Sequence, residues 1–462
     1  MDLDYQEFVQ TGQIASFISA VARCTGINDS EVSLLSLRSG CVIVVLRLPK
    51  AGADMLIRDG FDASTAGLTA AQVEMLNRVQ RITEGDVVEA PFLRRKVPLD
   101  PDVSWLHLSD LHIDEDFDKS TSDTRADLER FLNDFPEQLE KAGIVPDMVF
   151  FTGDIAANGR AKQYKIADRF FQAVRDRLPP APMKMSASAP KQPVPFFIVP
   201  GNHDVDWDAI DPRIENEMRT RLAEGVEYKD LPKDIRAHTE KRHKNYTRFA
   251  KANNESEVKW HGHAYSKCFQ AGRRNISFGV AGFNSAWHST RKMLLEETVG
   301  MPFSAPNLDL QHLSLGGEQI RSAKAEIANS LVRVALFHHP PESEWFRDSD
   351  RALQREELNF FDFVLRGHQH EPKASQSVRV AGNDDYIELA PAALRTRPKN
   401  FQGFMSVQLD FTQKLMRIRS WTVTNRARRW VPDQEFGDGG IETYKIPETL
   451  LNRIDRVSSS ML

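Results

Sequence analysis

The sequence predicts an α/β fold for most of the chain, preceded by a small α+β module. Between about residues 99 and 430, short apolar runs rich in β-branched and aromatic residues alternate with helical patterns. Such runs are typical of strands that are buried on both faces of a sheet. The chain has 462 residues, more than one ordinary hydrophobic core accommodates, so we expect at least two domains.

Residues 1–95 form the first predicted unit. Residues 6–24 carry apolar side chains at helical spacing, and the apolar segments 32–37 and 41–48 flank a short polar turn, which together predict a helix followed by a β-hairpin. Because this unit lacks a cluster of His, Asp or Cys, we expect no chemistry in it. Two interpretations stay open: an extra domain that covers hydrophobic surface, or an adaptor or regulatory module that binds a protein partner.

The composition indicates a globular protein of a reducing compartment. Hydrophobic residues make up 41% of the chain and charged residues 27%, with a formal net charge of -5, which argues against a surface coated by nucleic acid. The three cysteines are scattered without disulfide or metal-site spacing. The chain begins with acidic rather than basic residues and has no apolar run long enough to span a membrane. We therefore expect a cytoplasmic protein without a membrane partner.

The second predicted unit, residues 99–430, begins a few residues before the first long apolar run. Two segments differ from its alternating pattern. Residues 205–265 are charged and helical in pattern, which suggests an insertion that overhangs any site nearby. Residues 431–462 are predicted to form a polar C-terminal tail. The predicted strands are 103–108, 147–152, 195–199, 277–281, 332–337 and 361–365.

Five short polar motifs follow five of these strands, each at the point where the apolar run stops. Open α/β sheets bind their ligands at the carboxyl ends of strands, so we expect the motifs to share one site. The motifs are Asp110-Leu111-His112, Gly153-Asp154, Gly201-Asn202-His203-Asp204, His338-His339-Pro340 and Gly367-His368-Gln369-His370.

The side chains in these motifs indicate the kind of metal. Carboxylates, an amide oxygen and imidazoles without any thiolate suit ions such as Mn, Fe or Zn and disfavour a structural Cys-zinc site. The motifs supply too many ligands for one ion. They suit two ions if one carboxylate bridges both.

In this order, the motifs resemble those of the calcineurin-like metallophosphoesterase superfamily, over roughly residues 103–425. The resemblance implies a two-sheet β sandwich flanked by helices. It also implies that one ion is held by Asp110, His112, Asp154 and His370, and the other by Asp154, Asn202, His338 and His368. His203 would then protonate the leaving group as general acid or stabilise the developing charge, with Asp204 orienting it.

The resemblance implies a hydrolase in which a metal-activated hydroxide attacks a phosphoester. Protein Ser/Thr phosphatases carry an Asp-Arg pair after the second motif, whereas the sequence here is Ile155-Ala156-Ala157-Asn158-Gly159. The difference favours the bacterial-type phosphodiesterases, phosphatases and nucleases, and we expect a phosphodiester of a nucleotide or nucleic acid as substrate. The alternatives are a phosphomonoesterase and a scaffolding or partner-regulated protein of the same fold.

For several further residues, the sequence leaves more than one role open. His338 lies nearest the strand end and matches the family motif, so we favour it over His339 as the ligand. His107 is expected to pack beside the site without binding metal. Arg395 and Arg397 are candidate phosphate neighbours. Asn284 and Trp287 either line the pocket or belong to the core. For the histidines of the insertion we favour a solvated surface; they are His238, His243, His261 and His263.

Overall fold

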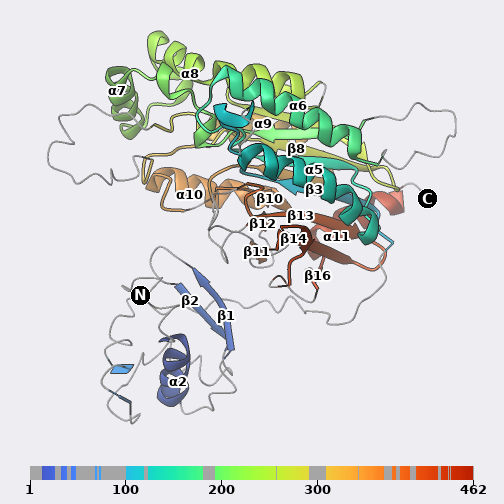
Figure 1. Cartoon of the computed structure of the whole chain (residues 1–462). Coiled ribbons are helices and arrows are strands. Elements are labelled where there is room, and N and C mark those ends of the chain that lie inside the picture. The colour runs from blue at the N-terminus through green and yellow to red at the C-terminus, as the bar shows by residue number, and fades with distance from the viewer. Residues whose placement is uncertain are drawn as a thin grey trace. The chain divides into compact units, whose positions relative to one another are not determined.

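Figure 1 shows the computed structural model of the whole chain. The structure describes residues 13–25, 33–38, 43–47, 68–69, 72–73, 100–118, 123–179, 193–255, 257–290, 309–341, 343–368, 377–380, 386–395, 402–424, 428–434, 436 and 439–460.

The chain divides into two compact units, Met1–Glu89 and Ala90–Leu462. In the first unit, helix α2 (Gln13–Thr25) precedes the strands β1 (Ser33–Arg38) and β2 (Ile43–Arg47), which pair antiparallel. Apolar residues at helical spacing give α2 one buried face, formed by Phe17, Val21 and Cys24.

Two seven-stranded sheets form the centre of the second unit. The order in the first is β15-β14-β13-β3-β4-β5, with β16 also paired to β14, and the order in the second is β11-β12-β10-β9-β8-β7-β6. The first sheet comprises β3 (Val103–Leu108), β4 (Met148–Thr152), β5 (Phe196–Val199), β13 (Gly403–Asp410), β14 (Leu415–Val423), β15 (Trp430–Pro432) and β16 (Ile441–Lys445). The second comprises β6 (Lys259–His261), β7 (Ala264–Ala271), β8 (Ile276–Gly282), β9 (Val332–Leu336), β10 (Phe363–Leu365), β11 (Ser377–Val380) and β12 (Ile387–Ala390).

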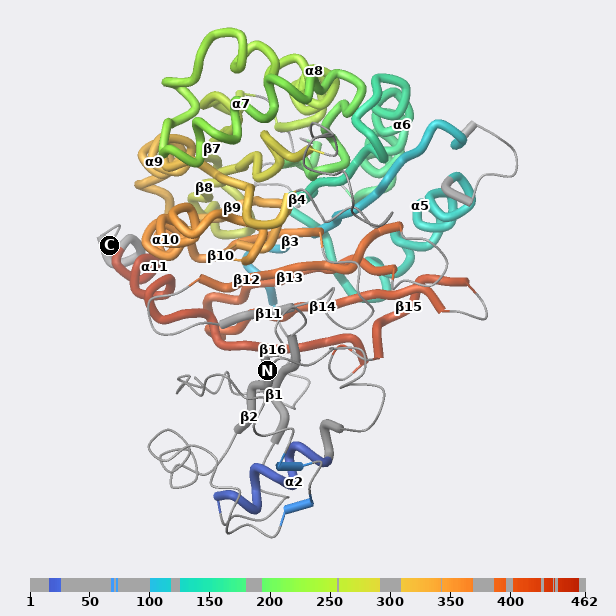
Figure 2. The backbone as a smooth tube through the Cα atoms, turned by 90° about the vertical axis from the view of Figure 1, so that its left-hand side faces the viewer, coloured from blue at the N-terminus to red at the C-terminus, as the bar shows by residue number. Residues whose placement is uncertain are grey.

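Helices cover the outer faces of the two sheets (Figure 2). Apolar side chains of both sheets, among them Trp105 and Phe363, meet in the central core. A second cluster packs α5 (Asp123–Ala142), α6 (Ala161–Arg177) and α8 (Lys233–Asn253) on the first sheet, and a third packs the second sheet against α9 (Gly317–Ile327). The predicted sandwich flanked by helices is confirmed.

Parallel pairing brings the ends of the motif-bearing strands together. β3 pairs with β4 and β4 with β5, all in parallel, while β9 pairs in parallel with β8 and with β10. The loops that follow β3, β4 and β5 therefore leave the same edge of the first sheet, and those that follow β9 and β10 leave one edge of the second.

The insertion is helical only in part. It contains η4 (Trp207–Ala209), α7 (Pro212–Ala223), η5 (Tyr228–Asp230) and α8, but its last residues form β6 and enter β7. His261, Gly262 and His263 make the turn between these two strands, where Gly262 has a φ of 62°.

The segment after residue 430 is not a polar tail. β16 pairs with β14, and α11 (Glu448–Ser460) buries Leu450, Leu451 and Ile454 in the central core. The three apolar residues lie at helical spacing on one face, so the segment closes one side of the sandwich.

Candidate metal centre

Backbone hydrogen bonds join the motif loops to one another. Asp110 N donates to Gly153 O at 3.0 Å, and His112 N donates to Asp154 O at 2.8 Å. On the other sheet, Gly367 N donates to His338 O at 3.1 Å. The two sheets meet where His368 N donates to Asp110 Oδ2 at 3.2 Å, so the loops form one rigid frame.

Four of the predicted metal ligands have left-handed backbone conformations. The φ angles are 57° at Asp110, 47° at His112, 54° at Asp154 and 76° at His368. Such angles are uncommon outside glycine and cost about 1–3 kcal/mol each. Strain of this kind persists where the surrounding structure enforces it, commonly at functional sites, which supports a common role for these residues.

The glycines of two motifs make room for the acidic side chains. A Cβ on Gly201 would lie 2.6 Å from Asp154 N, and a Cβ on Gly367 would lie 2.8 Å from Asp110 Oδ2. Both distances are shorter than real side chains tolerate. Glycine at these positions therefore lets the loops pack directly against the carboxylates.

Asp154 lies at the centre of the arrangement. Its Oδ2 is 3.3 Å from His338 Nε2 and 3.8 Å from His112 Nε2, while its Oδ1 accepts a hydrogen bond from His203 N at 2.8 Å. Burial alone would raise the pKa of Asp154, but the facing imidazoles, led by His338, hold it well below its usual value. The carboxylate is thus ionised and reaches ligands from both sheets.

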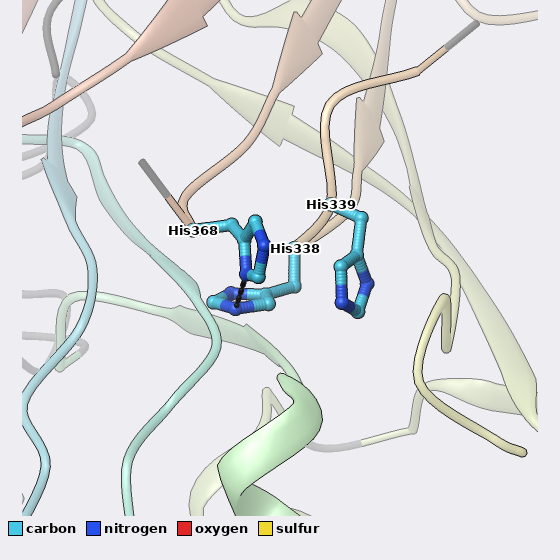
Figure 3. Close-up of side chains that lie close together, drawn as sticks. All are labelled: His338, His339 and His368. Atoms are coloured by element: carbon cyan, nitrogen blue, oxygen red, sulfur yellow. Dashed lines mark hydrogen bonds between the residues drawn. The ribbon is translucent and has the colours of Figure 1, made fainter. Parts of the chain in front are cut away.

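His338 faces Asp154 in an orientation suited to metal binding. Its Nδ1–H donates to Thr152 O at 2.7 Å, which leaves Nε2 directed at the carboxylate, and His368 Nδ1 lies 3.2 Å from the same Nε2 (Figure 3). Burial alone would lower the pKa of His338, but Asp154 raises it to about 9. The electrostatics therefore favour a positive charge between the two side chains.

The His339 ring lies beside the His338 and His368 pair and takes no part in the hydrogen bond between them (Figure 3). Its Nδ1 lies 2.9 Å from Ser285 Oγ, and the ring is fully buried. Burial holds the pKa of His339 well below its usual value, so the ring is neutral.

The residues that the structure describes fit a metal centre. Asn202 Oδ1 is buried and has no hydrogen-bond partner within the described chain, and a metal ion would satisfy this oxygen. Potential ligand atoms converge in three groups: His338, His339 and His368; His112, Asp154 and His203; and Asp110, Asp154 and His338. His370 lies outside the described residues, so its predicted role stays a prediction.

Comparison with known proteins identifies the family. The calcineurin-like phosphoesterase family profile matches residues 104–372, more than half of the chain. The chain belongs to this family. The match spans all five motifs, and members of the family typically bind divalent metal ions, in agreement with the convergent Asp and His ligands.

Solved structures resemble this calcineurin-like phosphoesterase only distantly. A Vps29 single mutant from Entamoeba histolytica is 12% identical with a TM-score of 0.28, over 72% of this chain and 98% of that one. Vps29 from Chaetomium thermophilum is 10% identical with a TM-score of 0.25, over 75% and 98%. Haemophilus influenzae NAD nucleotidase is 12% identical with a TM-score of 0.29, over 77% of this chain and 56% of that one. A search of curated proteins gives no match.

The ring of His203 lies at the site, but Asp204 does not contact it. His203 Nδ1–H donates to Ala157 O at 2.8 Å, and the ring packs against His112 with centroids 4.7 Å apart. The buried Asp204 carboxylate instead accepts from the backbone N–H of Ile155, Ala156 and Gly201 and from Tyr164 Oη. Asp204 therefore acts on His203 only through the loop that carries the Ala157 carbonyl.

Burial changes the pKa of Asp204 more than its hydrogen bonds do. Desolvation, together with the neighbouring Asp154 carboxylate, raises the pKa of Asp204 to about 7 despite three backbone donors. Tyr164, from α6, supplies a fourth donor, with its Oη 2.9 Å from Asp204 Oδ1. No sequence pattern indicated Tyr164, because its contact with Asp204 joins segments that are distant along the chain.

Other predicted residues surround the site without entering it. His107 is fully buried, with Nε2 3.0 Å from Thr152 Oγ1, and burial lowers its pKa to about 3. Arg395 Nη1 donates to His112 O at 2.7 Å, and Nη2 lies 3.2 Å from Asp114 Oδ2, so this side chain braces the first loop. Arg397 lies outside the described residues.

In the loop after β8, Trp287 and Asn284 belong to the core, whereas Ser285 reaches the site. Trp287 is buried against Met218, Leu231 and Ile235 of the insertion, and Asn284 Oδ1 accepts from Ala286 N. The sequence missed Ser285, whose Oγ accepts from the backbone N–H of His338 at 3.3 Å. Its position just after a predicted strand was the available signal.

The expectation of solvated histidines in the insertion was wrong for two of the four, and the other two are half-buried. His238 and His243 are buried, and His243 Nε2–H donates to Trp287 O at 3.0 Å. His263 stacks on the Trp287 ring with centroids 5.6 Å apart, whereas the half-buried His261 bonds to Ser266 Oγ. In the part of the chain that the structure describes, no helix is long and apolar enough to cross a membrane.

Proposed function

We propose that this protein is a binuclear metal-dependent phosphoesterase that hydrolyses a phosphodiester. The position of Asp154 carries the proposal. Its carboxylate faces His338 of one sheet at 3.3 Å and His112 of the other at 3.8 Å, as a bridging ligand requires. The left-handed backbone at three of the neighbouring ligands supports the same role.

The assignment of ligands is the one that the family resemblance implies, and the convergence of Asp110, Asp154 and His338 at one point supports a shared carboxylate. Asp110, His112, Asp154 and His370 would hold one ion, and Asp154, Asn202, His338 and His368 would hold the other. When bound, two ions of Mn, Fe or Zn supply Lewis acidity and a hydroxide at neutral pH. The protein itself supplies the fixed frame of loops that orients these side chains.

His203 is the proposed general acid. Because its Nδ1–H is donated to Ala157 O, the ring orientation is fixed and Nε2 is the nitrogen that can pass a proton to the leaving oxygen. At the position where protein Ser/Thr phosphatases carry the Asp of their Asp-Arg pair, this chain has Ala157, whose backbone carbonyl orients the His203 ring.

Two tryptophans favour a substrate that carries a nucleobase. The Trp207 ring lies 5.3 Å from His203, and the Trp345 ring lies 4.6 Å from His368; both side chains are partly exposed. Partly exposed aromatic rings stack nucleobases with little sequence preference. A nucleotide or nucleic-acid diester therefore fits the surroundings of the site.

Hydrolysis of two chromogenic substrates tests the proposal. With Mn²⁺ added, the protein should hydrolyse bis(p-nitrophenyl) phosphate well above p-nitrophenyl phosphate, and His203→Ala should lower turnover by about 10²–10⁴-fold with metal content retained. The reverse substrate ranking would instead support a phosphomonoesterase. Less than one ion per chain, with no turnover, would support a scaffolding protein.

A further inference from the structure

Hydrogen bonding at Ser285 fixes the protonation of His339. Ser285 Oγ accepts the backbone N–H of His338 at 3.3 Å and that of His339 at 3.2 Å, and it lies 2.9 Å from His339 Nδ1. A hydroxyl has two acceptor positions and one hydrogen. Because the two backbone donors fill both acceptor positions, the hydroxyl hydrogen is directed to Nδ1. With Nδ1 accepting this hydrogen, the ring carries its own hydrogen on Nε2.

This Nε2–H group is buried without an acceptor. The ring is 0% exposed, and Nε2 has no hydrogen-bond partner within the described chain. Leaving a buried donor unpaired is costly, so such groups are generally satisfied by protein, water or ligand.

The neighbours of the ring place this donor at the metal centre. The His339 centroid lies 4.5 Å from that of His368 and 5.1 Å from that of His338, and potential ligand atoms of the three residues lie within 4.8 Å of one another. The Trp345 ring lies 6.0 Å away. An acceptor that enters beside His338 and His368 therefore comes within reach of the donor.

We propose that His339 is a catalytic residue whose Nε2–H donates a hydrogen bond to a phosphoryl oxygen of the substrate. The inference rests on the proposed phosphoesterase function and deepens it. Phosphoryl oxygens carry the negative charge of the reaction, and a fixed donor in a buried site stabilises that charge without reorganisation. Ser285 is the positioning residue, since it selects the tautomer that presents the donor.

The main alternative is that His339 binds metal. Coordination through Nε2 would require its hydrogen to move to Nδ1, where it would face the hydroxyl of Ser285 that already accepts two backbone donors. The hydrogen-bond arrangement therefore opposes this alternative. Metal content distinguishes the two roles.

Three substitutions of His339 in the full chain test the proposal. His339→Leu removes both nitrogens, His339→Asn keeps an amide near the position of Nδ1 alone, and His339→Gln keeps an N–H near the position of Nε2. The exposed His312 supplies the matched control, His312→Leu. Metal content is measured by elemental analysis, and the affinity of the Mn-loaded protein for inorganic phosphate is measured by calorimetry.

We expect two ions per chain in every variant. Phosphate should bind about tenfold more weakly to His339→Leu and His339→Asn, because both lose the hydrogen-bond donor that faces the phosphate charge. The affinities of His339→Gln, which keeps a donor, and of the control His312→Leu should stay within about threefold of that of the unmodified protein. Turnover should fall about 10²-fold or more in the first two variants. If His339→Leu does not fold, the comparison of His339→Asn with His339→Gln gives the same test.

Two results would overturn the inference while the proposed function stands. Unchanged phosphate affinity and turnover in His339→Asn would show that the ring only packs, and loss of one ion per chain in that variant would show that His339 is a ligand. If the unmodified protein binds neither Mn²⁺ nor phosphate, the proposed function fails, and this inference fails with it.

Discussion

Asp154 reaches ligands of both sheets because the residue packed against it has no side chain. Gly201 lies so close that a Cβ there would be 2.6 Å from Asp154 N. Asp154 itself adopts a φ of 54°, which its hydrogen bonds to the neighbouring loops enforce. The arrangement of the proposed metal ligands thus depends on a few close backbone contacts.

The substitution Gly201→Ala should therefore reduce metal binding. The added methyl group forces Asp154 away from His338 and His112, so we expect fewer than two ions per chain by elemental analysis and a corresponding loss of turnover. Gly262→Ala, in an open turn at a φ of 62°, is the matched control and should lower stability only. Full metal content in Gly201→Ala would contradict this account of the site.

His263 should make folding sensitive to acid. Burial lowers its pKa from 6.5 to about 3, so below pH 6.5 the unfolded chain takes up a proton that the folded protein does not. The neutral His263 therefore contributes to the free energy of unfolding above pH 6.5, and this contribution is lost as the pH falls towards 3. Between pH 7.5 and 5.5 the loss amounts to about 1.4 kcal/mol.

The variant His263→Phe keeps a ring against Trp287 and removes this titration. Urea unfolding at pH 7.5 and 5.5 should therefore show a smaller drop in the free energy of unfolding for the variant, by about 1 kcal/mol. An equal drop in both proteins would mean that His263 is not neutral in the folded state.

The positions at strand ends indicated which side chains would lie together, but not which groups would orient them. Asp110, His112, Asp154, His338 and His368 do converge, and their role as metal ligands stays a prediction. The acceptors that orient the imidazoles are backbone carbonyls, such as those of Thr152 and Ala157, which leave no signature in a residue pattern. For the same reason, Asp204 was expected on the His203 ring rather than on the loop beside it.

At the scale of elements, buried strands were predictable and amphipathic surface segments were not. The strands of the sandwich are continuous apolar runs, whereas the described side chains of α11 include three buried apolar residues among polar ones. The opposite error occurred in the charged helix α8, whose polar sequence hides a buried charged residue. Its Arg242 is fully buried, paired with Glu215 at 2.6 Å and bonded to Trp287 O, a tertiary arrangement that charge patterning does not reveal.

Leu450 should report whether α11 belongs to the core. Because its side chain is 0% exposed within the central cluster, Leu450→Ala should lower the free energy of unfolding by about 2–5 kcal/mol. The matched variant Leu310→Ala changes a residue that is 37% exposed and should cost about 0.5 kcal/mol or less. Equal effects of the two substitutions in urea unfolding would show that α11 does not seal the sandwich.

For the whole molecule, two sheets contribute to one centre. Asp110, His112, Asp154 and Asn202 follow strands of the first sheet, while His338 and His368 follow strands of the second. Asp154 is the residue that both groups face, so the centre exists only when the sandwich is folded. All of these residues lie in the unit Ala90–Leu462, and a regulatory role for Met1–Glu89 remains our hypothesis.

The most direct test of the binuclear proposal is a metal titration of turnover. Metal-stripped protein is titrated with Mn²⁺ while hydrolysis of bis(p-nitrophenyl) phosphate is followed. We predict that turnover rises until two equivalents per chain are bound, because in the proposed mechanism both ions act together on the attacking and leaving oxygens. Saturation at one equivalent, or no turnover at any metal content, would contradict the proposal.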